Sequence, residues 1–166
     1  MIQFIGNCRD YLDRDILEFI LKTDGNKRPN KLDIVSKEKR EIFNLWKSSG
    51  YDLNKLEWHV YYQINLNKTF LIPPIFVSVV DWWFVKLNPG NIFPHHIDQF
   101  DSTKKIKRYW VACNDYKAGH VFSCADQLLC NYSFGDIFLF EGTISYHGAA
   151  NIGFDPFISL QICTTY

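Results

Sequence analysis

Two histidines and one aspartate have the residue types and spacing of a metal site. His96 and Asp98 are separated by one residue in the segment NPGNIFPHHID, and residues two apart in an extended strand point to the same face. One imidazole and one carboxylate can therefore share a metal ion. A third ligand would complete a two-histidine, one-carboxylate triad, which leaves adjacent positions open and is typical of non-haem Fe(II). His147, in the segment SYHGAANIG, is the best candidate for that ligand.

The residues around these candidates form short motifs in a fixed order. The motifs are Pro89-Gly90, Pro94-x-His96-x-Asp98, a Gly135-Asp136 turn before the apolar run IFLF, and His147-Gly148. This order resembles the iron(II)/2-oxoglutarate-dependent oxygenase superfamily, whose prolyl hydroxylase-like members carry a PGxxxPxHxD segment. The resemblance covers Trp82 to Ile162 and implies that Fe(II) is bound by His96, Asp98 and His147. His95 competes as the first ligand, but alternation along the strand places it on the opposite face from Asp98.

The sequence departs from this family at the residue expected to anchor 2-oxoglutarate. Many members carry an arginine after the distal histidine and a serine or threonine two positions later, and both bind the far carboxylate of the co-substrate. The matching residues here are Phe157 and Ser159, so the serine is kept and the guanidinium is absent. Phenylalanine cannot replace a cation opposite a dicarboxylate.

A second source of the anchor lies on the strand that follows the first two metal ligands. Asparaginyl hydroxylases and JmjC-type members of the superfamily carry a basic residue there, and this sequence reads KIKRYWVAC. We predict Arg108 as the carboxylate anchor, with Lys107 as the alternative on the opposite face. Tyr109, Asn151 and Ser159 are further candidates, which would add neutral hydrogen bonds to the co-substrate. The competing interpretation of Arg108 is a solvated charge at a strand end.

The elements that must position these residues are mainly strands. Two helices are predicted first, over Cys8–Lys22 and over Ser36–Ser49, the latter with Ser36 as N-cap and Gly50 just past its end. The strands predicted after them are Trp58–Leu66, Ile75–Leu87, Asn91–Asp98, Lys107–Cys113, His120–Cys124, Ile137–Phe140, Ser145–Ala149 and Ile158–Thr164. Short strands separated by turn signals indicate a sandwich or barrel.

The predicted fold class is α+β, mainly β: a double-stranded β-helix, or jelly roll, with N-terminal helices packed on it. A chain of 166 residues is most simply one domain. We expect residues 1–50 to form a helical N-terminal support and residues 51–166 to form the jelly-roll barrel.

Composition and charge exclude several other classes of protein. Hydrophobic residues make up 47% of the chain, which argues against disorder, and 18 basic residues balance 18 acidic ones. Binding to nucleic acid or to a membrane is therefore not expected. Five cysteines without a CxxC pair predict reduced thiols, and neither a signal peptide nor a membrane span is expected. We expect a cytoplasmic protein.

The pattern of metal ligands and the resemblance to the oxygenase superfamily together predict a hydroxylase-type dioxygenase. The resemblance implies Fe(II), dioxygen, 2-oxoglutarate as co-substrate, and oxidation of a C–H bond in a small molecule, an amino acid or a peptide side chain. One alternative is a metal-dependent oxidase or dioxygenase of the same fold that does not use 2-oxoglutarate, which would explain Phe157. The other is a non-catalytic jelly-roll binding or structural protein whose histidines are incidental.

Overall fold

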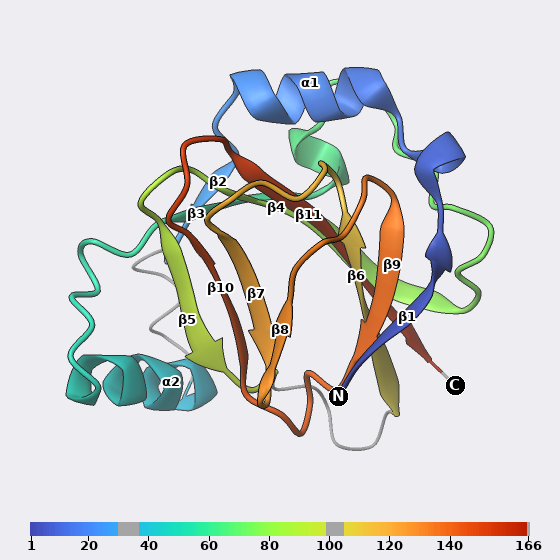
Figure 1. Ribbon diagram of the computed structural model, residues 1–166. Helices are drawn as coiled ribbons and strands as arrows, with labels where there is room; N and C mark the ends of the chain where they lie inside the picture. The colour runs from blue at the N-terminus through green and yellow to red at the C-terminus, as the bar shows by residue number, and fades with distance from the viewer. Residues whose placement is uncertain (30–36, 99–104, 166) are drawn as a thin grey trace.

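The fold is a pair of antiparallel sheets that face each other, with helices added to them (Figure 1). The computed structural model describes residues 1–29, 37–98 and 105–165. Within these residues the larger sheet has seven strands in the order β1-β9-β6-β11-β4-β3-β2, and the smaller has four in the order β5-β10-β7-β8. This architecture is a double-stranded β-helix, as the sequence predicted.

The strands of both sheets are short, apart from the two that form the centre of the larger sheet. The larger sheet consists of β1 (Ile2–Asn7), β2 (Asn26–Arg28), β3 (Trp58–Tyr61), β4 (Val79–Leu87), β6 (Ile106–Ala112), β9 (Asp136–Phe140) and β11 (Phe157–Thr165). The smaller sheet consists of β5 (Ile92–His96), β7 (His120–Cys124), β8 (Gln127–Leu129) and β10 (His147–Asn151). Strands β4 and β11 pair along almost their whole length.

Helix α1 (Arg14–Lys22) begins at Asp13, whose carboxylate accepts hydrogen bonds from the backbone N–H groups of Asp15 and Ile16. Its apolar side packs with alternate residues of the larger sheet, including Phe84 and Leu160, which are partners across β4 and β11. The next residues along those strands point between the two sheets. Helix α1 therefore covers the outer face of the larger sheet.

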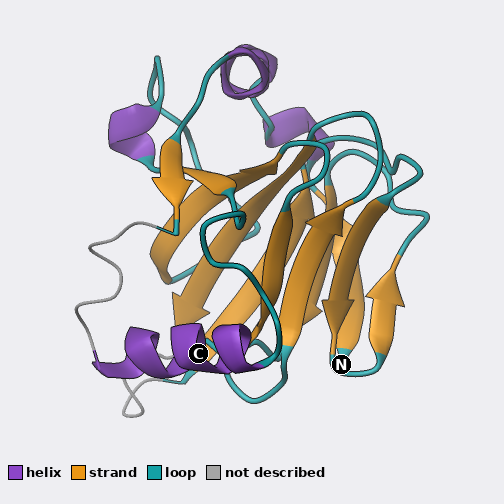
Figure 2. Ribbon diagram, turned by 90° about the vertical axis from the view of Figure 1, so that its left-hand side faces the viewer, coloured by secondary structure: helices purple, strands orange, loops and turns teal. Residues whose placement is uncertain are grey.

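Helix α2 (Lys37–Ser48) lies beside the end of β5 (Figure 1 and Figure 2). Phe43 and Trp46 from this helix join the hydrophobic cluster between the sheets. The indole nitrogen of Trp46 donates a hydrogen bond to the carbonyl oxygen of His95 at 2.8 Å. This bond ties α2 to the strand that carries the first predicted metal ligand.

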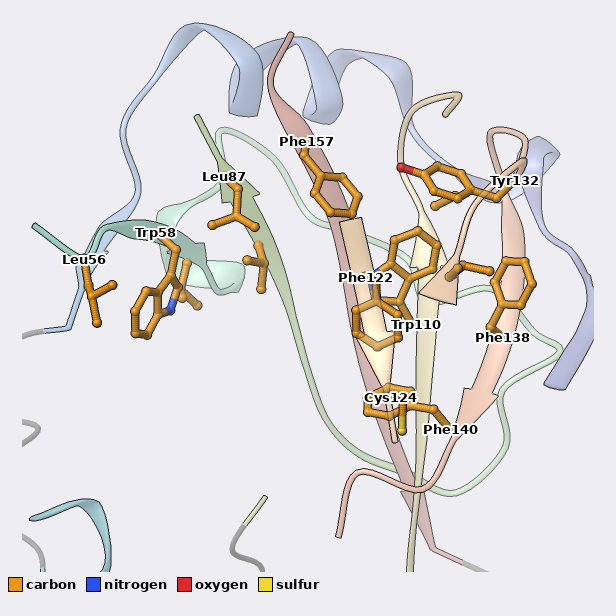
Figure 3. Packing of buried hydrophobic residues seen from close by; sticks show 14 of the residues in the cluster. Leu56, Trp58, Leu87, Trp110, Phe122, Cys124, Tyr132, Phe138, Phe140 and Phe157 are labelled. Atoms are coloured by element: carbon orange, nitrogen blue, oxygen red, sulfur yellow. The ribbon is translucent and has the colours of Figure 1, made fainter. Parts of the chain in front are cut away.

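The cluster between the sheets is rich in aromatic side chains (Figure 3). Trp110 from the larger sheet stacks on Phe122 from the smaller one, with ring centroids 5.4 Å apart. On β5, Phe93 stacks on Trp58 of the larger sheet at 4.2 Å. These pairs join the two sheets, and burial of such rings is a major source of stability for a fold of this kind.

The structure corrects the sequence prediction most clearly in the first fifty residues, which were expected to be helical. Strands β1 and β2 both lie in this region, and α1 begins at Arg14 because the residues before it form β1 and a short 3-10 turn at Arg9–Tyr11. Gly50 follows α2 with a φ of 91°, as expected of a residue that ends a helix. The predicted N-cap Ser36 lies outside the described residues.

Elsewhere the strands differ from the prediction mainly at their ends. The strand β3 ends at Tyr61 because Gln63–Asn65 form a 3-10 turn, and β4 begins only at Val79. The short strand β8 was not predicted, whereas β7 has the predicted bounds. In the described part of the chain, no helix is both long and apolar enough to cross a membrane.

Candidate metal centre

The three predicted metal ligands meet where β5 and β10 pair. His147 lies directly opposite His96 across the two strands, and the centroids of their rings are 4.3 Å apart. Asp98 follows β5, and its backbone N–H donates a hydrogen bond to the carbonyl oxygen of Gly142 at 2.8 Å. One ligand atom from each of the three side chains lies within 4.8 Å of the others. The structure therefore brings these residues together in an arrangement that could hold a metal ion.

Hydrogen bonds to the backbone set the orientation of both imidazoles. Nδ1 of His96 lies 2.9 Å from the carbonyl oxygen of Pro94, and Nδ1 of His147 lies 3.2 Å from that of Ser145. A carbonyl oxygen can only accept, so each Nδ1 carries a proton, and in the neutral form of each ring Nε2 presents the lone pair. These Nε2 atoms lie 3.6 Å and 3.5 Å from the carboxylate oxygens of Asp98. Both tautomers are thus the ones that metal binding through Nε2 requires.

The protonation states of these residues also suit a metal. Burial raises the pKa of Asp98, but the guanidinium of Arg108 and the two imidazoles outweigh it, and the pKa lies below its usual range. Burial, together with the nearby His96 and Arg108, lowers the pKa of His147 to about 3. At neutral pH the centre therefore offers an ionised carboxylate and a neutral imidazole from His147.

Gly142 leaves the space that the carboxylate of Asp98 occupies. A Cβ atom at this position would lie 2.6 Å from Oδ2 of Asp98 and 3.3 Å from Cε1 of His147. Any side chain would therefore displace at least one predicted ligand. The tight approach gives Gly142 a role that its sequence context, EGT, does not reveal.

Arg108 points toward the metal centre and is buried, so the structure does not fit the interpretation of a solvated strand-end charge. Its Nη1 lies 2.8 Å from Oδ2 of Asp98, and the side chains of the two residues are 5% and 13% exposed. The guanidinium also lies over the ring of Trp83, 4.8 Å from its centroid. Lys107 is half-buried and does not line the cavity between the sheets.

Ser159 and Gln161 continue a row of polar side chains from Arg108 along β11. Nη2 of Arg108 donates to Oε1 of Gln161 at 3.4 Å, and Nε2 of Gln161 donates to Oγ of Ser159 at 3.0 Å. All three residues line the cavity. Sequence reasoning missed Gln161, although its position two residues after Ser159 on the same strand placed it on the same face.

The structure does not bring Tyr109 or Asn151 to this cavity. Tyr109 lies next to Arg108 in β6 and so points to the outer face, where its ring packs against Phe76 at 5.2 Å. The amide nitrogen of Asn151 donates to the carbonyl oxygens of Leu87 and Asp155. Asn151 thereby holds the connection between β10 and β11, and neither residue is placed to contact a co-substrate.

His95 and Phe157 lie where strand alternation puts them. His95 is exposed, and its Nε2 lies 2.7 Å from Oγ of Ser123 in β7, which lies beyond β10 in the smaller sheet. Phe157 is buried in the cavity wall and stacks on His120, with ring centroids 4.6 Å apart. The position at which the family arginine was expected is therefore filled by a packed aromatic pair.

The metal centre opens onto a cavity of about 260 Å³ between the two sheets. Its described wall is mostly apolar and aromatic. The lining residues are Arg28, Pro29, Ile42, Phe43, Trp46, Trp58, Val60, Tyr62, Trp83, Val85, Leu87, Phe93, His96, Asp98, Arg108, Trp110, Phe122, His147, Gly148, Ala149, Phe157, Ser159 and Gln161. A concave apolar site with a few convergent polar groups is typical of a small-molecule site.

Comparison with known proteins gives similarity of architecture alone. No protein-family profile and no curated protein sequence matches the chain. Among solved structures, a predicted oxalate decarboxylase from Thermotoga maritima is 14% identical with a TM-score of 0.45, covering 66% of this chain and 82% of that one. The cupin domain of Schizosaccharomyces pombe Cnp3 is 13% identical with a TM-score of 0.42, covering 71% and 66%.

A third similar structure is an uncharacterised Klebsiella pneumoniae protein with a double-stranded β-helix domain. It is 18% identical to this chain with a TM-score of 0.38, and the match covers 52% of this chain and 72% of that one. At these identities and TM-scores the similarities carry no inference about activity.

Proposed function

We propose that this protein is a non-haem Fe(II) dioxygenase that hydroxylates a C–H bond of its substrate, with 2-oxoglutarate as co-substrate. The observation that carries the proposal is the cluster of His96, Asp98 and His147 in the wall of an apolar cavity. Two imidazole nitrogens and one carboxylate oxygen leave coordination positions open, and this donor set suits Fe(II). When bound, iron and 2-oxoglutarate supply the oxidising chemistry, in which dioxygen is consumed and carbon dioxide and succinate are released.

The residues of the chain would bind and orient the reactants. Arg108 offers guanidinium donors to an anionic co-substrate beside the iron, and Gln161 and Ser159 add neutral donors and acceptors along the same wall. The apolar remainder of the cavity excludes water, which strengthens these polar interactions. The carboxylate of buried Asp98 stays ionised because the positive charge of Arg108 beside it lowers its pKa.

A second candidate is a metal-dependent dioxygenase or oxidase that does not use 2-oxoglutarate. Two observations favour it: Phe157 occupies the position of the family arginine, and Arg108 is already paired with the carboxylate of Asp98. A guanidinium held by a metal ligand has fewer donors left for a co-substrate carboxylate. This candidate keeps the same three metal ligands.

An anaerobic titration separates the candidates. Fe(II) is added to the metal-free protein, 2-oxoglutarate follows, and the visible absorption is recorded. A charge-transfer band that requires both supports the 2-oxoglutarate-dependent enzyme, and iron binding without the band supports the second candidate. Absence of iron binding contradicts both and leaves a non-catalytic jelly-roll protein.

Variants of adjacent histidines provide a matched control for the titration. His96→Ala is expected to abolish iron binding because it removes one of three ligands, whereas His95→Ala is expected to retain it because His95 faces away from the centre. Arg108→Gln tests the co-substrate separately: affinity for 2-oxoglutarate should fall while iron stays bound. Unchanged 2-oxoglutarate affinity in Arg108→Gln would remove the anchor from the proposal.

A further inference from the structure

We infer that the cavity beside the metal centre binds a flat, largely apolar molecule that carries a ring and no positively charged group. This inference deepens the proposed function, because the molecule would be the substrate of the proposed enzyme. It rests on the charge, the shape and the size of the described cavity wall. Among a small molecule, an amino acid and a peptide side chain as substrate, it disfavours the free amino acid.

The charges of the wall disfavour an amine. Of the described residues that line the cavity, Asp98 is the only acidic one, and its Oδ2 lies 2.8 Å from Nη1 of Arg108. The other charged lining residue is Arg28. An ammonium group in this cavity would lie near guanidinium groups and would have to compete with Arg108 for the single carboxylate. Burial of a charge without a partner is costly, so a cationic or zwitterionic ligand binds poorly.

The aromatic side chains of the wall favour a flat ligand. Four of the five tryptophans line the cavity, namely Trp46, Trp58, Trp83 and Trp110. Their rings are fixed by neighbouring rings: Trp58 stacks on Phe93 with an angle of 14° between the ring planes. Aromatic pairs gain energy beyond the burial of their surface, and fixed rings cost little entropy on binding.

The cavity wall takes residues from both sheets: Trp58, Leu87, Trp110 and Phe157 lie in the larger sheet, and Phe122 lies in the smaller one. Figure 3 draws Trp58 and Leu87 on one side and Phe122, Trp110 and Phe157 on the other. Residues of both groups line the same cavity. A ligand between them would contact aromatic faces or edges on both sides.

The size of the cavity limits the ligand to a small molecule. A closed apolar cavity of roughly 150 Å³ is enough to bind benzene. The volume of about 260 Å³ therefore accommodates a small co-substrate beside one ring, or a bicyclic ring system by itself. A peptide side chain could enter only as a single aromatic or aliphatic group.

Three probes test the inference on the metal-free protein, and the second and third each differ from the first in one main property. They are 3-phenylpropionamide, which is neutral and aromatic, 3-phenylpropylamine, which adds a positive charge, and hexanamide, which lacks the ring. Binding is measured by calorimetry and by quenching of tryptophan fluorescence. We expect saturable binding of 3-phenylpropionamide, with affinities of the amine and of hexanamide each lower by roughly tenfold.

Two tryptophan variants locate the bound probe. Trp58→Leu should weaken binding of 3-phenylpropionamide roughly fivefold or more, because it removes part of the cavity wall. Trp82→Leu is the matched control, since Trp82 packs with Phe70 in the cluster on the outer face of the larger sheet. Trp83→Leu replaces Trp58→Leu if the latter does not fold, as judged by its urea unfolding curve.

The outcomes overturn or support the inference independently of the proposed function. Equal affinity for the amide and the amine, no saturable binding of the amide, or equal losses in Trp58→Leu and Trp82→Leu would each overturn it. Because no metal is present, binding of the amide by a protein that fails to bind Fe(II) supports this inference while rejecting the proposed function. Binding of iron and 2-oxoglutarate without binding of the amide rejects this inference alone.

Discussion

Asp98→Asn in the metal-free protein tests whether the buried pair of Asp98 and Arg108 contributes to stability as its geometry indicates. The two charged groups are 2.8 Å apart, with side chains only 13% and 5% exposed. Two unit charges at about 4 Å attract each other by about 4 kcal/mol at an effective dielectric constant of about 20. Removing one partner of a buried pair leaves the other uncompensated, so we expect the free energy of unfolding to fall by about 3–5 kcal/mol.

Removing the other partner, in Arg108→Gln, should lower the free energy of unfolding by less. It leaves the carboxylate of Asp98 without its guanidinium, but burial raises the pKa of a lone carboxyl group, which can bind a proton and become neutral, whereas a lone guanidinium cannot lose its proton. The double variant should be more stable than the sum of the two single losses predicts, because no buried charge is left unpaired. We expect a coupling energy of about 2–4 kcal/mol from the double-mutant cycle.

Urea unfolding at pH 7.5 in the presence of a chelator measures all four proteins of the cycle. The m-value serves as a control, because a changed slope would mean a changed folded or unfolded state and not a simple change in stability. A coupling energy below about 1 kcal/mol, which is ordinary for exposed ion pairs, would refute the reasoning. It would mean that Arg108 does not hold Asp98 in the folded protein.

Three further predictions concern the metal centre and its surroundings. His96→Ala should abolish binding of a divalent metal, measured by calorimetry, whereas His95→Ala should bind it as the unaltered chain does; equal losses would contradict the assignment of ligands. Gly142→Ala should weaken metal binding roughly tenfold or more, because its Cβ would lie 2.6 Å from a carboxylate oxygen of Asp98. Burial lowers the pKa of His120 in the folded protein, so the unfolded chain binds a proton first and stability falls as pH decreases below about 6.5. The urea midpoint of the metal-free protein should therefore decrease less steeply between pH 7.5 and pH 5.5 in His120→Gln, and identical slopes would exclude this cause.

The sequence predicted most of the strands because runs of β-branched and aromatic residues between turn signals are a local property. It also predicted the common face of His96 and Asp98, which depends only on their spacing along one extended segment. It missed β1 because Ile2–Asn7 carries no distinct strand pattern, and this segment becomes a strand by pairing with β9. Local propensity is weak where tertiary pairing decides the structure.

For the candidate site, the sequence by itself determined which residue types were available and which neighbours on a strand share a face. Only the tertiary structure decided that His147 lies opposite His96, that Arg108 reaches Asp98, and that Gln161 continues the polar wall. These contacts join strands that are far apart along the chain, so their register depends on how the two sheets pair and pack. The charge of a buried group likewise depends on partners that no local pattern specifies. The apolar character of the cavity depends in the same way on residues that several separate strands and α2 bring together.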